Sequence, residues 1–301
     1  MNRSSLSEKK DVIGTLYTIA AFTLWGSLPG YWKLLKSIPP DEIVFHRIVW
    51  TFVFATIFIL WAGKKQTLFN ILKNKKQRFI VIFASIALVI NWMVYVYAVN
   101  ADHIVEASLG YFINPLVSIF LGMIILKEKL TPIQIAALIL AVGAVLFLSI
   151  NNGRFPWIAI ILAFSFGLYG LIKKMGNLDS MASLSIEMLC LIPVSISIIL
   201  FKEYHGTGAM QNSSLLINII LIGTGFISAV PLYWFAQGTK MISLSRIGFI
   251  QYITPTITLL IGVVIYKEPF TSSHVISFSL IWVALILYTA SILMAKKGRG
   301  Y

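Results

Sequence analysis

The sequence predicts an all-α integral membrane protein with ten transmembrane helices, arranged as two inverted five-helix repeats. Three observations support this: an apolar composition, ten apolar segments of membrane-spanning length, and a motif that recurs later in the chain. Of the 301 residues, 58% are hydrophobic and 12% are charged, whereas an average soluble domain is roughly 45–50% apolar and ~25% charged. Such a chain lacks the polar surface to cover a core in water, so we expect the bilayer to be its solvent.

Ten segments are long enough to cross a bilayer, which requires ~20 mostly apolar residues at ~1.5 Å each. They are residues 12–31, 41–62, 79–99, 104–126, 131–150, 156–172, 180–201, 215–238, 244–266 and 274–295. The first follows a short tail and precedes nine more, so we expect a retained span and no cleaved signal peptide. The sixth, which ends before Lys173, is the shortest. The single cysteine, Cys190, lies in the seventh, so we expect no disulfide framework and no cysteine-based metal site.

The basic residues predict the orientation of the chain. With an even number of spans both termini lie on one side, and that side receives 18 of the 24 Lys and Arg residues. The other side receives 5, and Arg47 lies within a span. The positive-inside rule therefore predicts a multi-pass protein of the cell membrane with both termini cytoplasmic. Because the charges are spread over short loops without an aromatic platform, we expect no nucleic-acid binding.

An internal repeat organises the sequence. Residues 106–115 (Glu-Ala-Ser-Leu-Gly-Tyr-Phe-Ile-Asn-Pro) correspond to residues 246–255 (Arg-Ile-Gly-Phe-Ile-Gln-Tyr-Ile-Thr-Pro) at an offset of 140 residues. Both stretches precede an apolar run that ends in Lys-Glu, and Glu128 and Glu268 keep the same offset.

The same correspondence extends over both halves of the chain. Leu-Trp-Gly at residues 24–26 resembles Leu-Tyr-Gly at residues 168–170. The halves, residues 12–150 and 156–295, hold five predicted spans each. Because five is odd, the second half is expected to sit upside down relative to the first. Inverted repeats of this kind are a transporter architecture, with the substrate site at mid-membrane between the repeats.

A family resemblance is carried by these motifs. The doubled pattern of a proline-bearing fourth span, a glycine, Lys-Glu and a further span resembles the EamA type of the drug/metabolite transporter superfamily. Four stretches of the chain resemble the RarD-like branch of that family: residues 40–43 with His46-Arg47, 106–115, 249–252 and 281–285. The resemblance covers essentially the whole chain. It implies a ten-helix inner-membrane carrier, an exporter of metabolites or drug-like solutes.

Four charged residues stand out inside the predicted spans: Arg47, Glu106, Glu187 and Arg246. A charge at mid-bilayer costs ~2.5–3.5 kcal/mol on insertion scales, so each is a functional candidate that needs a partner. The topology places Arg47 with Glu106 near the outer face and Glu187 with Arg246 near the inner face. We predict one ion pair at each face, and we expect the two pairs to act as alternating gates. The alternative is that all four side chains snorkel from helix ends to the interface.

Polar groups beside these charges are candidates for the substrate path. His46 either carries a proton in a coupled cycle or stays neutral as a hydrogen-bonding group. Asp41 and Glu42 follow two prolines and are expected to stabilise the first turn of their helix. The other candidates are uncharged: Asn91, Trp92, Tyr111, Asn114, Gln251 and Tyr252. The alternatives for these are hydrogen bonds between helices and ordinary packing. Trp32, Trp61 and Trp157 lie near span ends and are expected to be interfacial anchors.

Four prolines fall within the predicted spans: Pro115, Pro193, Pro231 and Pro255. Each removes a backbone donor and frees a carbonyl one turn earlier. We expect bends around a central path, with static kinks as the simpler alternative.

These observations favour a secondary carrier without a cofactor, one that contacts the bilayer and a small-molecule substrate and acts as a monomer. The sequence has no Gly-x4-Gly-Lys-[Ser/Thr] phosphate loop. The alternatives are a membrane-embedded enzyme and a solute channel. An enzyme needs clustered catalytic groups, yet no two of the four histidines have a metal-binding spacing. A channel favours rings of like charge, whereas the charges here are inverted in sign between the halves.

Overall fold

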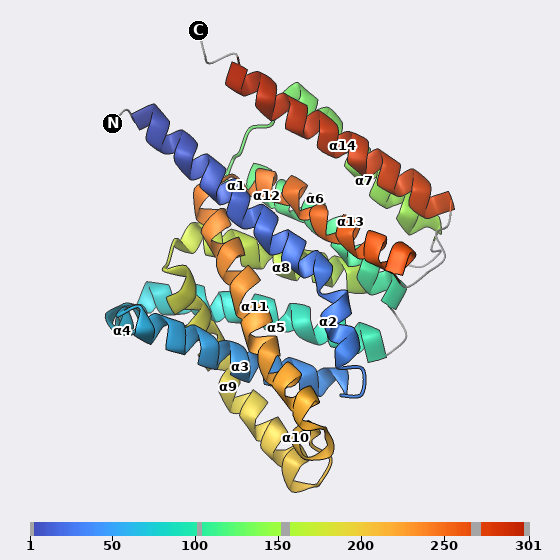
Figure 1. Cartoon of the computed structure of the whole chain (residues 1–301). Helices are drawn as coiled ribbons and strands as arrows, with labels where there is room; N and C mark the ends of the chain where they lie inside the picture. The colour runs from blue at the N-terminus through green and yellow to red at the C-terminus, as the bar shows by residue number, and fades with distance from the viewer. Residues whose placement is uncertain (1–2, 101–103, 152–156, 266–271, 298–301) are drawn as a thin grey trace.

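The computed structural model describes residues 3–100, 104–151, 157–265 and 272–297, and within these ranges it contains helices and short connections only (Figure 1). The helices are α1 (Arg3–Ser27), α2 (Pro29–Leu34), α3 (Pro40–Trp61), α4 (Lys65–Lys73), α5 (Lys75–Asn100), α6 (Ile104–Ile124), α7 (Pro132–Asn151), α8 (Trp157–Gly176), α9 (Ser180–Tyr204), α10 (Ala209–Asn212), α11 (Leu215–Met241), α12 (Leu244–Gln251), α13 (Ile253–Leu260) and α14 (Ser272–Lys297). A π-helical segment, η1 (Ile261–Ile265), follows α13.

The helices confirm a multi-pass membrane protein. Seven helical stretches of the described chain are long and apolar enough to cross a membrane: Glu8–Leu34, Pro40–Trp61, Lys75–Tyr95, Trp157–Gly176, Ser180–Tyr204, Leu215–Met241 and Leu244–Ile265. Three shorter apolar helices, Gly110–Ile124, Pro132–Phe147 and Phe278–Met294, overlap the remaining predicted spans. The count of ten spans stays a prediction.

The sixth predicted span is longer than the sequence indicated. The sequence predicts that this span ends at residue 172, but α8 continues to Gly176. Lys173 therefore lies on a buried helical face instead of in a loop.

Local signals in the sequence set several helix starts. Pro40 occupies the first turn of α3, where its missing N–H costs nothing. Asp179 accepts hydrogen bonds from the backbone N–H groups of Met181 and Ala182 at the start of α9. Ser243 does the same for Arg246 in α12.

The four intramembrane prolines behave in two ways. Pro115, Pro193 and Pro231 lie inside the continuous helices α6, α9 and α11. Pro255 follows the junction at Tyr252 that separates α12 from α13. Proline has no backbone N–H to donate to the carbonyl one turn earlier. The helix is therefore interrupted shortly before Pro255.

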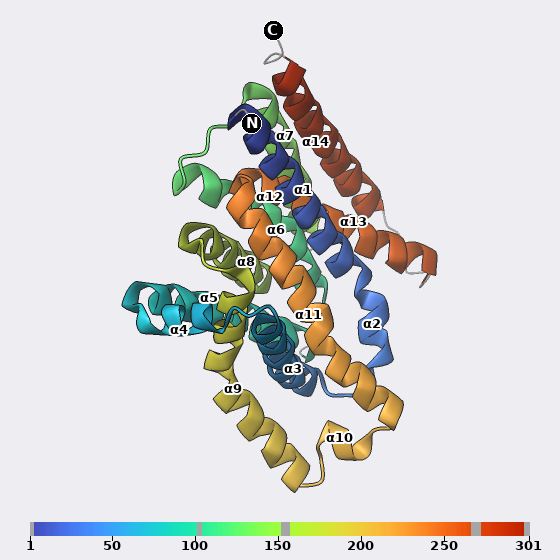
Figure 2. The same cartoon turned by 60° about the vertical axis from the view of Figure 1, so that its left-hand side comes forward.

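Helix contacts join the two halves of the chain throughout. The largest contacts pair α6 with α8, α7 with α14, α3 with α9, α1 with α11 and α3 with α11. Further contacts pair α5 with α8, α6 with α12, α5 with α9, and α1 with α12 and α13. Each of these contacts joins a helix of the first half of the chain to a helix of the second half. In Figures 1 and 2, α7 and α14 lie side by side along one edge, and α1 runs beside α11.

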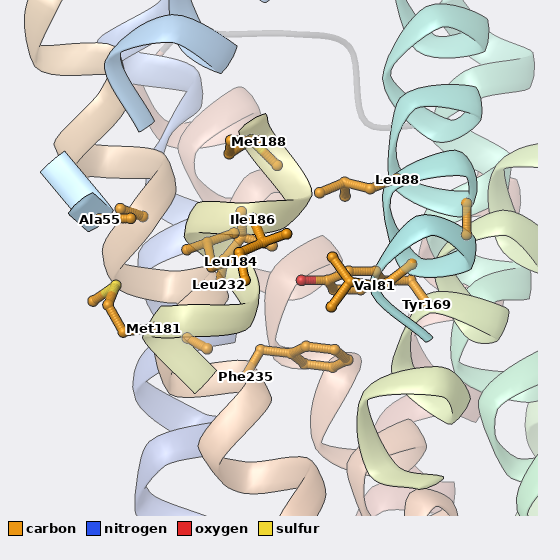
Figure 3. Close-up of a cluster of buried hydrophobic side chains, with 14 of the residues drawn as sticks. Ala55, Val81, Leu88, Tyr169, Met181, Leu184, Ile186, Met188, Leu232 and Phe235 are labelled. Atoms are coloured by element: carbon orange, nitrogen blue, oxygen red, sulfur yellow. The ribbon is translucent and has the colours of Figure 1, made fainter. Parts of the chain in front are cut away.

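Two layers of apolar side chains fill the bundle. The larger cluster joins α1, α3, α5, α8, α9 and α11, and a second joins α6, α7, α12 and α14. In the larger cluster the rings of Tyr169 and Phe235 stack with centroids 6.0 Å apart. Figure 3 shows these two rings and the hydroxyl of Tyr169 directed toward α9.

The contact between α3 and α11 depends on a glycine. A Cβ atom at Gly225 would overlap the backbone of Trp50 on α3. Gly143, also in a helix interior, has no neighbour within 4 Å of an added Cβ. These two glycines therefore form a matched pair for testing the packing.

We expect Gly225→Ala to destabilise the folded protein by ~1–3 kcal/mol because it overpacks the helix contact. Gly143→Ala should be neutral or stabilising by up to ~1 kcal/mol, because alanine lowers the entropy of the unfolded chain at an open position. Thermal midpoints in one detergent measure both. A Gly225→Ala variant that melts as high as Gly143→Ala would contradict this packing of α3 on α11.

Candidate functional site

Arg47 is held between aromatic rings. Its Nε donates a hydrogen bond of 2.6 Å to Oγ of Ser228 on α11. The guanidinium carbon lies 4.0 Å from the ring centre of Trp92 on α5 and 5.4 Å from that of Trp32 on α2. A cation over the face of a tryptophan is attracted by the negative face of the ring. We call Arg47, Ser228, Trp92 and Trp32 the Arg47 cage.

Two tyrosines extend the Arg47 cage toward accessible surface. Tyr95 of α5 and Tyr111 of α6 interact electrostatically with Arg47, and their ring centroids lie 6.4 Å apart. Tyr95 is 38% exposed and Tyr111 is 45% exposed. The result is a cationic centre with aromatic walls, contributed by helices from both halves of the chain.

Glu187 forms a buried ion pair with Lys173. Nζ of Lys173 lies 2.6 Å from Oε1 of Glu187 and donates a second hydrogen bond of 2.6 Å to Ser183. The Tyr169 hydroxyl donates to Oε2 of Glu187 at 3.1 Å. The side chains of Lys173 and Glu187 are 5% and 1% exposed. Both carboxylate oxygens are thus satisfied inside the apolar cluster, which a buried charge requires.

The predicted pairing of Glu187 with Arg246 is wrong in this structure. The extra turn of α8 places Lys173 one turn after Tyr169, on the face that meets α9. Arg246 begins α12 and pairs with Asp11 of α1 at 2.9 Å. The side chain of Glu106 lies outside the described residues, so its pairing with Arg47 stays a prediction.

The Lys-Glu motif after the fourth span has a structural role. Oε1 and Oε2 of Glu128 accept hydrogen bonds of 2.7 and 2.8 Å from the backbone N–H groups of Leu244 and Ser245. A carboxylate at a helix amino terminus is favoured by the helix dipole. Glu128 therefore fixes α12 against the end of α6. Glu268, its counterpart, lies outside the described residues.

A second pair of charges lies where the α3–α4 and α8–α9 connections meet. Nζ of Lys64 is 3.1 Å from Oδ2 of Asp179. Burial acts to raise the pKa of Asp179, but the N–H of Ala182 and the ammonium of Lys64 outweigh it and lower the pKa overall.

Most of the uncharged candidates hold helices together instead of facing the Arg47 cage. Asn91 donates to the carbonyl of Leu162 and to Ser165 on α8. Buried Gln251 accepts from Ser118, and the Tyr252 hydroxyl donates to the carbonyl of Phe112. Buried Asn114 has no hydrogen-bond partner for Oδ1 within the described chain. Trp92 and Tyr111 are the predicted candidates that the structure places at Arg47.

His46 and its neighbours on α3 face α9. Asp41 accepts a 2.6 Å hydrogen bond from Lys202, in addition to its place in the first turn of α3. His46 and Glu42 are buried and lie close to Glu203 of α9. His46, a candidate for the substrate path, therefore faces a different helix from its neighbour Arg47.

Sequence reasoning missed several partners. Lys173 was assigned to a loop, and Asp11 to the amino-terminal tail. Ser228 is one of many serines in apolar spans and carries no sequence signal. Trp32 was assigned to the interface, whereas its ring faces Arg47. The Tyr-x3-Lys spacing of residues 169–173 puts both groups on one helical face and is the signal that was available.

The fold and these contacts define a polytopic helical membrane protein with a cationic aromatic site between helices from both halves. The chain belongs to the EamA-like transporter family, whose model matches residues 12–150 and again residues 156–290. The match to two segments covers most of the chain.

Curated relatives agree with this assignment. The chain is 42% identical over 289 residues to "Uncharacterized transporter YojE" of Bacillus subtilis (strain 168), covering 95% of this chain and 96% of that protein. It is 35% identical to "Protein RarD" of Escherichia coli (strain K12), covering 94% and 96%. One solved crystal structure has the same fold as this chain. The two structures match with a TM-score of 0.72 at 16% sequence identity, and the match covers 92% of this chain. The names of family and relatives point to a transporter rather than an enzyme.

We expect Lys173→Met and Glu187→Met each to destabilise the protein by ~3–5 kcal/mol, since each leaves one charge buried without its partner. The double variant should melt higher than either single variant because no buried charge remains.

Lys64→Met serves as the control for this cycle. It removes an ion pair whose lysine is 55% exposed, and such pairs contribute ~0–1 kcal/mol. Thermal midpoints of all four variants test the pair. If the two single effects simply add in the double variant, Lys173 and Glu187 do not stabilise each other.

Proposed function

We propose that the protein is a secondary transporter that moves small organic solutes across the cell membrane by alternating access. The observation that carries the proposal is the Arg47 cage, a cationic aromatic site built from helices of both halves. The family assignment supports transport. The position of the Arg47 cage between helices of both halves supports alternating access as the mechanism.

The two halves act as inverted repeats in this proposal. Two segments of the chain match the same family model. Some contacts between the halves occur in corresponding pairs, such as α1 with α11 and α5 with α8, and this supports a two-fold relation between the repeats. Five spans in each half invert the second relative to the first. Rocking of one repeat against the other then exposes a central site to each side in turn.

The Arg47 cage is the proposed solute site. The guanidinium attracts an anionic or carbonyl group, and the faces of Trp92 and Trp32 pack against an apolar or aromatic body. The substrate class is therefore amphipathic organic solutes with an acidic or strongly polar group. In the proposed cycle Glu106 competes with the solute for Arg47.

The end of the bundle that contains the Lys173–Glu187 pair is closed in this conformation. Tyr169 and Phe235 stack beside the Lys173–Glu187 pair, and all four side chains are buried. We assign the second gate to this group instead of the predicted Glu187–Arg246 pair. The basic residues place this end on the cytoplasmic side, so the structure corresponds to a state closed to the cytoplasm. The proposed direction is export, by a monomer.

A stability screen of purified protein is the first test. Ligands that bind the native state raise its thermal midpoint. At a ligand concentration of a hundred times Kd, the free energy of unfolding rises by ~2.7 kcal/mol. The panel holds amino acids, nucleosides, sugars and amphipathic drugs. We expect stabilisation by compounds that combine an aromatic body with an acidic or carbonyl group.

For a compound that stabilises, Arg47→Gln should weaken binding about 10-fold or more, because it removes a charge-assisted contact of ~1.5–3 kcal/mol. Arg78→Gln, a charge change in the first turn of α5, should leave binding unchanged. Flux of the same labelled compound into proteoliposomes should saturate and be competed by unlabelled compound. Non-saturating flux would indicate a channel, and chemical conversion of the solute would indicate an enzyme.

A further inference from the structure

We propose that Glu42, His46 and Glu203 form a binding site for a divalent cation of the zinc type, separate from the Arg47 cage. One ligand atom from each residue lies within 4.8 Å of the other two. Glu42 and His46 are one turn apart on α3, so both face the last turn of α9, which carries Glu203. A cation bound here bridges helices from the two halves of the chain.

Three buried polar atoms face this point without a hydrogen-bond partner in the described chain. They are Oε2 of Glu42, Nε2 of His46 and Oε2 of Glu203. Glu42 is 1% exposed and His46 is 2% exposed. Leaving buried polar atoms unsatisfied is costly, and their convergence on one point indicates that a ligand satisfies them.

The other oxygen of each carboxylate is already held. Oε1 of Glu42 accepts a hydrogen bond from the backbone N–H of Ala209, and Oε1 of Glu203 accepts one of 2.9 Å from Met210. Both donors lie in α10. Each carboxylate is thereby held through Oε1, which leaves Oε2 free to bind a cation, as outer contacts do for metal ligands.

A glycine makes room for this arrangement. A Cβ atom at Gly208 would overlap the carboxylate of Glu203. The backbone of Gly208 has φ −71° and ψ 146°, which any residue adopts, so the requirement is space and not conformation. Gly208→Ala therefore displaces Glu203 without removing a ligand.

The charges near the cluster favour a cation. Glu42 and Glu203 contribute two carboxylates, and a neutral imidazole adds no charge. Nζ of Lys202 lies 3.7 Å from Oε2 of Glu42, beyond hydrogen-bond distance, and is itself hydrogen-bonded to Asp41 at 2.6 Å. One ammonium leaves the group net negative, so a divalent ion is attracted.

The donor set selects the class of metal. An imidazole nitrogen with two carboxylate oxygens suits Zn²⁺, which binds three protein ligands and one further group. Ca²⁺ takes six to eight oxygens, and Mg²⁺ retains most of its water, so both are less well matched. A pocket of about 390 Å³ lies beside the cluster, and Gly208 and Ala209 line it. This pocket provides the approach for the ion.

The test uses the tag-free full-length chain in detergent, treated with chelator, in a Cys190→Ser background that removes the thiol. Isothermal titration with ZnCl₂ should give one bound ion per chain. Glu203→Gln and Gly208→Ala should each weaken zinc binding at least about 10-fold, the first by removing a ligand and the second by displacing it. An excess of Mg²⁺ should not displace the zinc.

His205→Gln is the matched control. This exposed histidine ends the same helix two residues after Glu203, and its ring contacts Phe201. Its loss should leave zinc affinity unchanged. X-ray absorption at the zinc edge should show nitrogen and oxygen ligands, and His46→Asn should remove the imidazole signal.

Thermal midpoints without zinc identify variants that fail to fold, and at least one of Glu203→Gln, Gly208→Ala and His46→Asn must fold for the comparison. Absence of stoichiometric zinc binding by the wild-type site would overturn the proposal. So would unchanged affinity in a folded Glu203→Gln protein, or equal displacement by Mg²⁺. The transport function is tested separately, so failure of one proposal leaves the other standing.

Discussion

In hydrocarbon a polar side chain has no water to bond with, so a polar group inside the bundle is costly unless it finds a partner within the protein. Lys173 and Glu187 show this constraint most clearly. Each would be prohibitively costly to bury alone, and together with Tyr169 and Ser183 they join α8 to α9 in the middle of an apolar cluster. The same requirement pairs Asn91 with α8 and Gln251 with Ser118.

The contacts of Asn91 with α8 and of Ser118 with Gln251 join opposite halves of the chain, so polar pairing also contributes to how the halves pack together. Small residues then set the closeness of the helices, as Gly225 does against the backbone of Trp50. Glu128, from the first half, fixes the start of α12 in the second. The contacts thus form between the repeats more than within either repeat.

Helix α3 carries two different groups of functional interest on neighbouring faces. Arg47 turns toward α5 and α11 and is surrounded by aromatic rings. Glu42 and His46 turn toward α9 and α10, where the α10 backbone orients Glu42 and Glu203. The α-helix accounts for this separation, since consecutive residues differ by about 100° around its axis.

The sequence alone determined the membrane class, the positions of the apolar helices and the repeat, because these depend on composition, length and spacing. It also identified Arg47 and Glu187 as charges too costly to bury without a partner, and Trp92 as a candidate for the substrate path. It did not determine the partners: Lys173 lies 14 residues from Glu187, and Ser228 lies 181 residues from Arg47. Glu203, which completes the cluster around His46, is likewise far from His46 along the chain. Only the packing of whole helices sets which faces meet, and one extra turn at the end of α8 brings Lys173 to Glu187 in place of the predicted Arg246.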